Sequence, residues 1–177
     1  MSGTLVSPQL RHLTAADRGR LEEITRAAGL FRPDEILVAL EVFDEAVRNG
    51  PGNTYQILGA DVEGRLAGWI CWGATPCTLG TFDLYWMAVD PALQGSGIGT
   101  ALLVEMEHRL DRVARLIVVE TAGRDDYEPT RSFYQARGYR EVARVPDFYA
   151  PGEDQVVFVK SVSGTSTSAK TPLAPHR

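Results

Sequence analysis

A run of glycines leads from the end of a predicted strand directly into a predicted helix, and this segment constrains the fold more than any other. It reads Val89-Asp90-Pro91-Ala92-Leu93-Gln94-Gly95-Ser96-Gly97-Ile98-Gly99-Thr100. The amide groups in the first turn of a helix have no partner within that helix, and the helix dipole adds partial positive charge there. Because glycines let an anion approach the backbone without a Cβ in the way, the segment predicts a cradle for a phosphate group.

Two common phosphate-binding motifs do not fit this segment. A nucleoside-triphosphate P-loop ends in Gly-Lys-Ser/Thr, and the segment contains no lysine. A dinucleotide-binding turn reads Gly-x-Gly-x-x-Gly, but its last position falls on Thr100 when counted from Gly95 and on Leu102 when counted from Gly97. A nucleotide-binding oxidoreductase is therefore a minor alternative, although Glu120 resembles the ribose-binding acid of that fold. A glycine turn that serves packing alone is a second alternative.

The hydrophobic pattern of the remaining chain predicts one mixed α/β domain. It favours strands at residues 6–13, 55–60, 66–72, 81–89, 116–120, 140–145 and 155–160. Helical spacing predicts four helices. The first ends near Ala28, the second follows a cap at Asp34, the third begins after Gly97, and the fourth runs from Pro129 to Arg137. This order gives antiparallel strands at both ends of the domain and one strand–helix–strand crossover between them. The strand at 116–120 is nearly all apolar, so we expect it to be covered on both faces.

The predicted domain spans residues 5–160, and residues 161–177 are expected to form a disordered tail. Serine, threonine and proline dominate this tail, and such a composition buries too little apolar surface to offset the entropy lost on ordering.

Charge narrows the classes of ligand. The formal net charge of the 177 residues is −5, and the tail contributes two cations, Lys170 and Arg177, without an acid. The first 160 residues therefore carry 16 basic and 23 acidic groups, a net charge of −7. This balance argues against a nucleic-acid partner and favours cationic partners such as amines.

No segment indicates a membrane span, a secretory leader or a metal site. The longest stretch without a charge, residues 66–82, is broken by three glycines and a proline. The first residues offer neither a basic start nor an apolar block, so we expect a cytoplasmic protein with no membrane partner. Cys71 and Cys77 have no third cysteine or nearby histidine, so we expect reduced thiols and no metal.

Two motifs resemble those of the GCN5-related N-acetyltransferase (GNAT) superfamily. The segment Gln94-Gly95-Ser96-Gly97-Ile98-Gly99 fits its Gln/Arg-x-x-Gly-x-Gly/Ala signature. The segment Phe133-Tyr134-Gln135-Ala136-Arg137-Gly138-Tyr139 is similar to its downstream Phe-Tyr-x-x-x-Gly-Phe/Tyr element. The two motifs have the family's order and separation, and the resemblance covers roughly residues 6–160. It implies a central, mostly antiparallel twisted sheet with a splay between the fourth and fifth strands.

The same resemblance implies an acetyltransferase that moves the acetyl group of acetyl-coenzyme A (acetyl-CoA) directly to a primary amine. The backbone of Met87 and Val89 would pair with the pantetheine arm, and the amides of residues 95–100 would hold the diphosphate. The cofactor-binding residues expected on this basis are Met87, Ala88, Val89, Gln94, Gly95, Ser96, Gly97, Ile98, Gly99 and Thr100. The family often has an asparagine seven residues before the tyrosine of its second motif, whereas this chain has Tyr127.

Transfer from sulfur to nitrogen requires a neutral amine and benefits from a proton on the departing thiolate. Tyr134 matches the family's proton donor, and a phenol titrates close enough to a thiol to donate to it. Glu120 ends an apolar strand beside the expected splay and is the candidate general base. The alternatives are that Tyr134 is a core aromatic, and that Glu120 is a solvated strand end or pairs with Arg124 or Arg131.

Three further residues are candidates for binding the amine. Asp83 and Tyr85 are expected to alternate toward the same face as Met87. Tyr149 belongs to an expected loop at 147–154 that combines acids with aromatics, a composition suited to a cation. Ordinary surface placement is the alternative for each.

The sequence does not identify the acceptor, which is either a small molecule or a protein N-terminus or lysine. A non-catalytic acyl-CoA-binding regulatory module is the alternative function. The oligomeric state is open, with a homodimer as one option.

Overall fold

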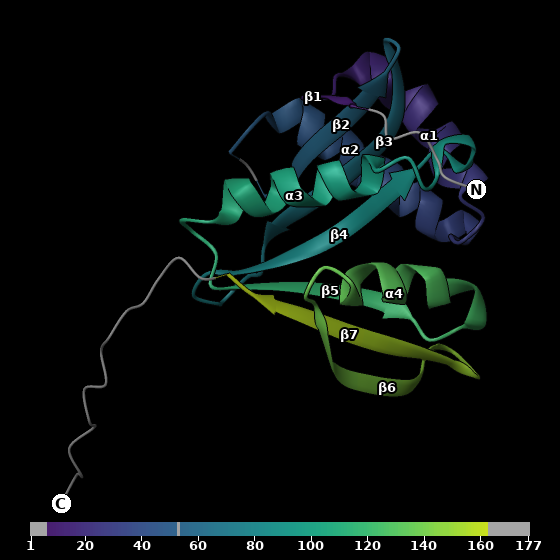
Figure 1. Cartoon of the computed structure of the whole chain (residues 1–177), viewed down its shortest axis with the longest axis vertical. Helices are drawn as coiled ribbons and strands as arrows, with labels where there is room; N and C mark the ends of the chain where they lie inside the picture. Colours follow the sequence, from purple (N-terminus) through teal and green to yellow (C-terminus); the bar gives the residue numbers. More distant parts are fainter. Residues whose placement is uncertain (1–6, 53, 163–177) are drawn as a thin grey trace, which may run out of the picture.

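One seven-stranded sheet forms the centre of the molecule in the computed structural model, which describes residues 7–52 and 54–162 (Figure 1). The strands are β1 (Gln9–Arg11), β2 (Gln56–Val62), β3 (Arg65–Ala74), β4 (Thr81–Val89), β5 (Leu116–Ala122), β6 (Arg140–Ala150) and β7 (Glu153–Ser161). Their order in the sheet is β1-β2-β3-β4-β5-β7-β6, and β4 and β5 form the one parallel pair in it. The start of the expected domain, residues 5 and 6, and residues 163–177 of the expected tail lie outside the described residues.

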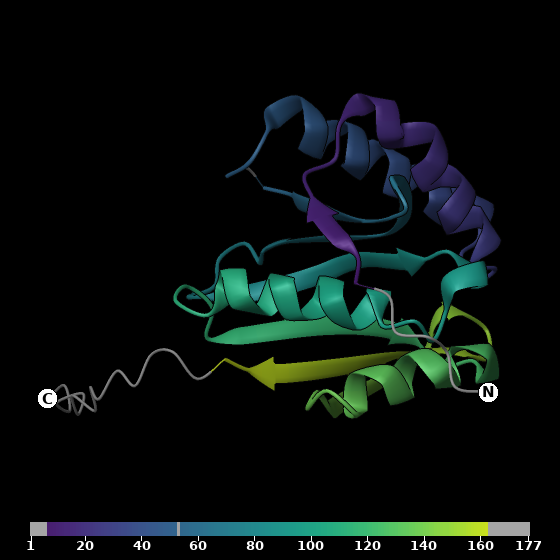
Figure 2. The same ribbon diagram turned by 45° about the horizontal axis from the view of Figure 1, so that its top comes forward.

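Helices cover the two faces of this sheet unequally. The helices α1 (Arg18–Ala27) and α2 (Pro33–Asn49) pack on one face of its first half, where Leu21 and Phe43 surround Trp69. The helix α3 (Ile98–Leu110) covers the other face, with an apolar stripe buried against the strands (Figure 2). Burying each large apolar side chain contributes roughly 1.5–3 kcal/mol, so these layers hold the first turn of α3 firmly against the sheet. The fourth helix, α4 (Glu128–Gln135), adds Tyr134 to the core on the α3 side.

The parallel pair β4–β5 opens part-way along its length. The two strands are paired only from Thr81 and Leu116 to Leu84 and Val119, although β4 continues to Val89 and β5 to Ala122. Beyond the last pair the strands diverge, as Figure 1 shows. The expected splay between the fourth and fifth strands, the mostly antiparallel sheet and the single crossover are therefore confirmed.

A β-bulge reverses the side-chain alternation of β4. Leu84 lies opposite Trp72 and Trp86 lies opposite Cys71, so Tyr85 is an extra residue in the ladder. Leu84 and Met87 consequently pack on the α3 side, whereas Trp86 packs on the α2 side. The expectation that Asp83 and Tyr85 alternate toward the face of Met87 is therefore wrong, because strict alternation does not continue through the bulge.

The segment 147–154 is a hairpin rather than a solvated loop. Residues 147–150 extend β6, Glu153 and Asp154 begin β7, and a two-residue turn at Pro151 and Gly152 joins the strands. Pro146 does not interrupt β6, because β6 is the edge strand of the sheet and a missing backbone N–H is tolerated there. Tyr149 is consequently a strand residue.

Two smaller expectations also need correction. The cap of α2 is Arg32, not Asp34, because Pro33 occupies the first helical position and Glu35 accepts a hydrogen bond from the Arg32 amide. The strand β5 is fully buried on one face, at Ile117 and Val119, and only partly covered on the other, where Val118 is half-buried and Glu120 is exposed. The reason is that α1 and α2 stop at the first half of the sheet (Figure 2).

Candidate active site

A cleft of about 1020 Å³ occupies the place where β4 and β5 diverge. Residues of both strands, the first turn of α3, α4 and the segment between α1 and α2 line it. All the site residues expected from the sequence line this cleft except Ser96. The structure thus brings together residues that are up to 66 positions apart in the chain, from Asp83 to Tyr149.

The first turn of α3 forms one end of this cleft. The helix begins at Ile98, and its earliest internal hydrogen bond runs from the Ala101 amide to the Gly97 carbonyl. The amides of Ile98, Gly99 and Thr100 therefore have no acceptor within the helix. Gly97 has a φ of 93°, a backbone conformation that residues with a side chain rarely adopt. This glycine therefore allows the chain to turn into the helix. The N-terminus of α3 therefore offers free backbone N–H donors, together with the positive end of the helix dipole, to an anion in the cleft.

Ser96 has a structural place in this turn. Its amide donates a hydrogen bond to the Leu93 carbonyl at 3.3 Å, and its hydroxyl donates to the same oxygen. Ser96 is 7% exposed and does not line the cleft. We therefore expect it to shape the turn that leads from η2 (Pro91–Leu93) to α3.

Tyr134 lies deep in the cleft, within an aromatic cluster. Its ring makes edge contacts with Phe133 and Tyr139, with centroids 5.3 and 5.5 Å apart, and it is 3% exposed. Burial raises the pKa of the Tyr134 phenol above its ordinary value, so the hydroxyl keeps its proton at neutral pH. No described residue hydrogen-bonds this hydroxyl, which leaves it available to a ligand in the cleft.

Glu120 and Asp83 form the acidic wall beside the splay. Partial desolvation, followed by the negative charge of Asp83, raises the pKa of Glu120, and a hydrogen bond from Gln155 opposes this shift. Asp83 accepts a hydrogen bond from the Thr75 hydroxyl at 2.7 Å. Within the described residues neither carboxylate has a cationic partner. In particular, Arg124 and Arg131, the two suggested partners of Glu120, bond elsewhere.

Two tyrosines lie beside these acids. Tyr85 makes an edge contact with the Tyr55 ring, with the ring centroids 5.4 Å apart. Partial burial is the main cause that raises the pKa of Tyr85, and the negative charge of Asp83 adds to it. Burial also raises the pKa of Tyr149, and the charge of Glu120 adds to that shift. The part of the cleft formed by β4, β5 and β6 therefore combines two carboxylates that have no cationic partner with two aromatic rings, a composition that attracts a cation.

A bridge that the sequence does not predict crosses from the α1–α2 segment to the segment after β5. Arg124 donates a hydrogen bond from Nη2 to the Leu30 carbonyl at 2.9 Å, and the Tyr127 hydroxyl donates to the same oxygen at 3.3 Å. Arg124 also forms an ion pair with Glu153 at 2.8 Å. Tyr127, the departure from the family's asparagine, was the one signal in the sequence that this place is unusual.

The comparison with known families decides the relationship that the two motifs suggest. A family model described as "Acetyltransferase (GNAT) domain" matches residues 53–141, half of the chain. The chain belongs to the GNAT acetyltransferase family. The part of the chain that matches the family model runs from the residues just before β2 to the start of β6. It therefore includes β4 and β5, which form the two walls of the splay, and the first turn of α3.

Relatives of this GNAT protein agree with that assignment. An uncharacterised N-acetyltransferase of Methanocaldococcus jannaschii is 31% identical over 119 residues, which cover 64% of this chain and 69% of the relative. A solved structure from Desulfovibrio desulfuricans, described as a GNAT-family acetyltransferase, is 36% identical and has a TM-score of 0.84, covering 89% of this chain and 100% of its own. The ribosomal-protein-S18-alanine N-acetyltransferase of Escherichia coli shares the fold at 19% identity, with a TM-score of 0.74 and coverage of 93% and 100%.

The described part of the chain has neither a helix suited to a membrane nor a cluster of metal-binding side chains. No helix there is both long and apolar enough to cross a bilayer. No group of three or more His, Cys, Asp or Glu side chains within residues 7–52 and 54–162 is arranged to hold a metal ion.

Proposed function

We propose that this GNAT protein transfers the acetyl group of acetyl-CoA directly to a primary amine. The observation that supports this most strongly is the cleft itself, which connects the free amides of α3 to Tyr134 and Glu120. The phosphates of the cosubstrate would lie against the first turn of α3, where donors and the helix dipole converge. The pantetheine arm would run along β4 between Met87 and Val89, where β4 is no longer paired with β5.

The amine has to lose a proton before it attacks. An alkylamine with a pKa near 10.4 is mostly protonated at pH 7, and deprotonating it costs roughly 4–5 kcal/mol at about 1.36 kcal/mol per pKa unit. Glu120 is the candidate base. Its pKa is raised from the ordinary carboxyl value toward neutral pH, and a carboxylate with a higher pKa is a stronger base. Asp83, Tyr85 and Tyr149 would bind the ammonium form beside it.

Transfer itself then needs one bond formed and one broken. The amine nitrogen bonds to the thioester carbon, the carbon–sulfur bond breaks, and the Tyr134 hydroxyl gives its proton to the departing thiolate. Because burial raises the pKa of Tyr134, the phenol is fully protonated before the step. The attacking nitrogen loses a second proton as the amide forms, and this proton restores the Tyr134 hydroxyl, whereas the proton accepted by Glu120 passes to solvent.

A screen of the purified protein against diverse amines tests this function, with release of free thiol from acetyl-CoA as the readout. Small diamines, amino acids, and peptides with free N-termini or lysines represent the acceptor classes that the sequence leaves open. Turnover with any of them supports the proposal. If coenzyme A binds but every amine leaves the thioester intact, the second candidate, a non-catalytic acyl-CoA-binding regulatory module, holds instead.

A further inference from the structure

Carboxylates dominate the wall of the cleft outside its α3 end. The charged residues that line the cleft in the described part of the chain are Glu35, Asp83, Glu120, Asp126, Glu153 and Arg137. The cation among them, Arg137, is hydrogen-bonded to Thr100 and so lies at the α3 end. The cleft is a ligand site on separate grounds, because the Tyr134 side chain on its wall is 3% exposed and its hydroxyl has no hydrogen-bond partner among the described residues. An acceptor bound beside β5 and β6 therefore meets a negatively charged wall.

Ion pairs neutralise two of these carboxylates and leave the others in need of a counter-charge. Arg124 binds Asp126 at 3.1 Å and Glu153 at 2.8 Å, so the charges of these two acids are matched within the protein. Asp83 and Glu120 have no cationic partner among residues 7–52 and 54–162. A single ammonium group between Asp83 and Glu120 would match this pair.

Glu35 is a further carboxylate with a weak counter-charge. Its Oε2 accepts a hydrogen bond from the Arg32 amide at 2.7 Å, which caps α2. Its Oε1 lies 3.5 Å from Arg32 Nη2, a distance longer than an ordinary charged hydrogen bond. Because the Arg32 side chain is 38% exposed, water screens this pair, and Glu35 keeps an oxygen and most of its charge for a ligand.

Two tyrosine rings lie within electrostatic reach of Glu35. Burial, followed by the charges of Glu120, Glu35 and Glu153, raises the pKa of Tyr149. Burial, followed by the charge of Glu35, raises the pKa of Tyr127 to about 12. Glu35 and Glu120 therefore act on the same part of the cleft, and aromatic rings beside them favour ammonium groups and the alkyl chain between them.

The reaction itself favours an acceptor with a second positive charge. The attacking nitrogen has to be neutral, so a monoamine that has lost its proton no longer carries a charge to hold it among the acids. A diamine keeps one ammonium group while its other nitrogen reacts. Binding of that remote group holds the neutral nitrogen in place during the attack.

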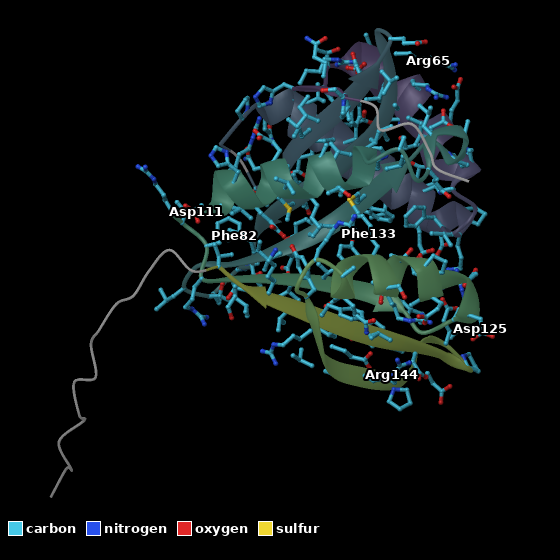
Figure 3. All side chains as sticks on the ribbon, in the orientation of Figure 1. Arg65, Phe82, Asp111, Asp125, Phe133 and Arg144 are labelled. Atoms are coloured by element: carbon cyan, nitrogen blue, oxygen red, sulfur yellow. The ribbon has the colours of Figure 1, made fainter. Side chains whose placement is uncertain are left out.

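The rim of the cleft favours a small acceptor over a polypeptide. Arg124 and Tyr127 are hydrogen-bonded to the Leu30 carbonyl at 2.9 and 3.3 Å, and Arg124 also pairs with the first residue of β7. Figure 3 shows this rim, where the labelled Asp125 of η3 (Asp125–Tyr127) lies next to the hairpin of β6 and β7. A polypeptide that left the cleft here would have to break these contacts.

We propose that the acceptor is a small diamine or polyamine, with the reacting nitrogen beside Glu120 and Asp83 and a second nitrogen, as ammonium, bound by Glu35. The inference rests on the proposed function, since it names the acceptor of that reaction. An amide forms at the nitrogen beside Glu120 and free thiol leaves, whereas the ammonium group on Glu35 keeps its proton and its charge. An acceptor that carries a carboxylate, such as an amino acid, would be repelled by the same wall.

Kinetics of the wild-type protein with matched pairs of acceptors test the proposal, with thiol release from acetyl-CoA as the readout. Each pair shares one carbon chain: 1,4-diaminobutane with butylamine, 1,5-diaminopentane with pentylamine, and 1,6-diaminohexane with hexylamine. A hydrogen bond to a charged group changes affinity about 10- to 100-fold, so kcat/KM for the best diamine should exceed that for its monoamine by this factor. A short peptide with a free N-terminus and a lysine should be a poorer acceptor than that diamine.

Glu35→Gln tests the place of the second ammonium group. The glutamine keeps an oxygen for the Arg32 amide, so the cap of α2 is retained while the charge is removed. This variant should lower the ratio of kcat/KM for the diamine to kcat/KM for the monoamine about 10-fold, mainly by raising KM for the diamine. Glu41→Gln, at an exposed residue of α2 that does not line the cleft, is the matched control and should keep the wild-type ratio. Thermal unfolding checks both variants, and a merely distorted cleft would lower the two efficiencies together and leave their ratio unchanged.

The outcomes separate this inference from the proposed function. Diamines that react no better than their monoamines overturn the inference, and so does a peptide that reacts better than every diamine; in both cases the acetyltransferase function itself holds. A ratio that Glu35→Gln leaves at the wild-type value overturns the assignment of the second ammonium group to Glu35. If no amine of any class releases thiol, the proposed function fails, and the inference fails with it.

Discussion

Tyr134→Phe separates chemistry from stability more cleanly than any other substitution in this cleft. The variant loses one hydroxyl, keeps the ring that packs against Phe133 and Tyr139, and breaks no hydrogen bond to a described residue. A polar group without a partner contributes little to folding, so we expect the free energy of unfolding to change by less than about 1 kcal/mol. For a chain of this size that corresponds to a melting temperature within about 4 °C of the wild type.

The effect on the rate should be far larger. General acid catalysis contributes roughly 10²- to 10⁴-fold, which is about 2.7–5.4 kcal/mol of activation free energy. Because the proton moves only in the transition state, kcat should fall by that factor and KM for acetyl-CoA should change little. A general acid has to be protonated to act, and burial raises the pKa of Tyr134 above the ordinary tyrosine value of about 10. The wild-type enzyme should therefore lose activity through ionisation of Tyr134 only above pH 10.

Thiol release from acetyl-CoA, measured with a competent amine from the screen, reads this out directly, and thermal unfolding of both proteins is the control. A Tyr134→Phe enzyme that is folded and whose kcat lies within threefold of the wild type would refute the general-acid role. Tyr134 would then be a core aromatic, the alternative that the sequence left open.

Further substitutions address the base and the phosphate cradle. Glu120→Gln should lower kcat/KM about 10²- to 10⁴-fold and abolish the acid limb of the pH–rate profile; a retained limb would assign it to another group. In the wild type this limb should lie above the ordinary carboxyl range, because the pKa of Glu120 is raised and the base has to be ionised. Asp83→Asn should move the limb to lower pH, since it removes the negative charge that disfavours ionised Glu120, and an unmoved limb would show that the two acids do not interact. Gly97→Ala places a side chain at a φ of 93°, which costs roughly 1–2 kcal/mol, and should weaken coenzyme A binding in calorimetry. Gly19→Ala, at a helical position with open space around it, is the matched control, and equal affinities of the two variants would argue against a role for this turn.

Local patterns in the sequence predicted the framework of the site well. The strand at 81–89 has the predicted bounds, and the helix starts directly after Gly97, because apolar periodicity and glycine placement are properties of neighbouring residues. The motif containing Tyr134 likewise placed that residue in the cleft. These features needed no knowledge of distant contacts.

Features that depend on distant partners could not be predicted in the same way. The bulge at Tyr85 exists only in the pairing of β4 with β3, and it reverses the face of every following residue. The extension of β6 depends on its pairing with β7, and the contact between Arg124 and Leu30 spans 94 positions.

One titration tests the role of the first turn of α3 most directly: adding coenzyme A to the ¹⁵N-labelled protein and following each backbone amide by NMR. The largest chemical-shift changes should fall on the amides of Gly97, Ile98, Gly99 and Thr100, because a bound phosphate would accept their hydrogen bonds. Coenzyme A that saturates the protein while these four signals stay in place would show that the phosphates bind elsewhere, and it would contradict this reading of the cleft.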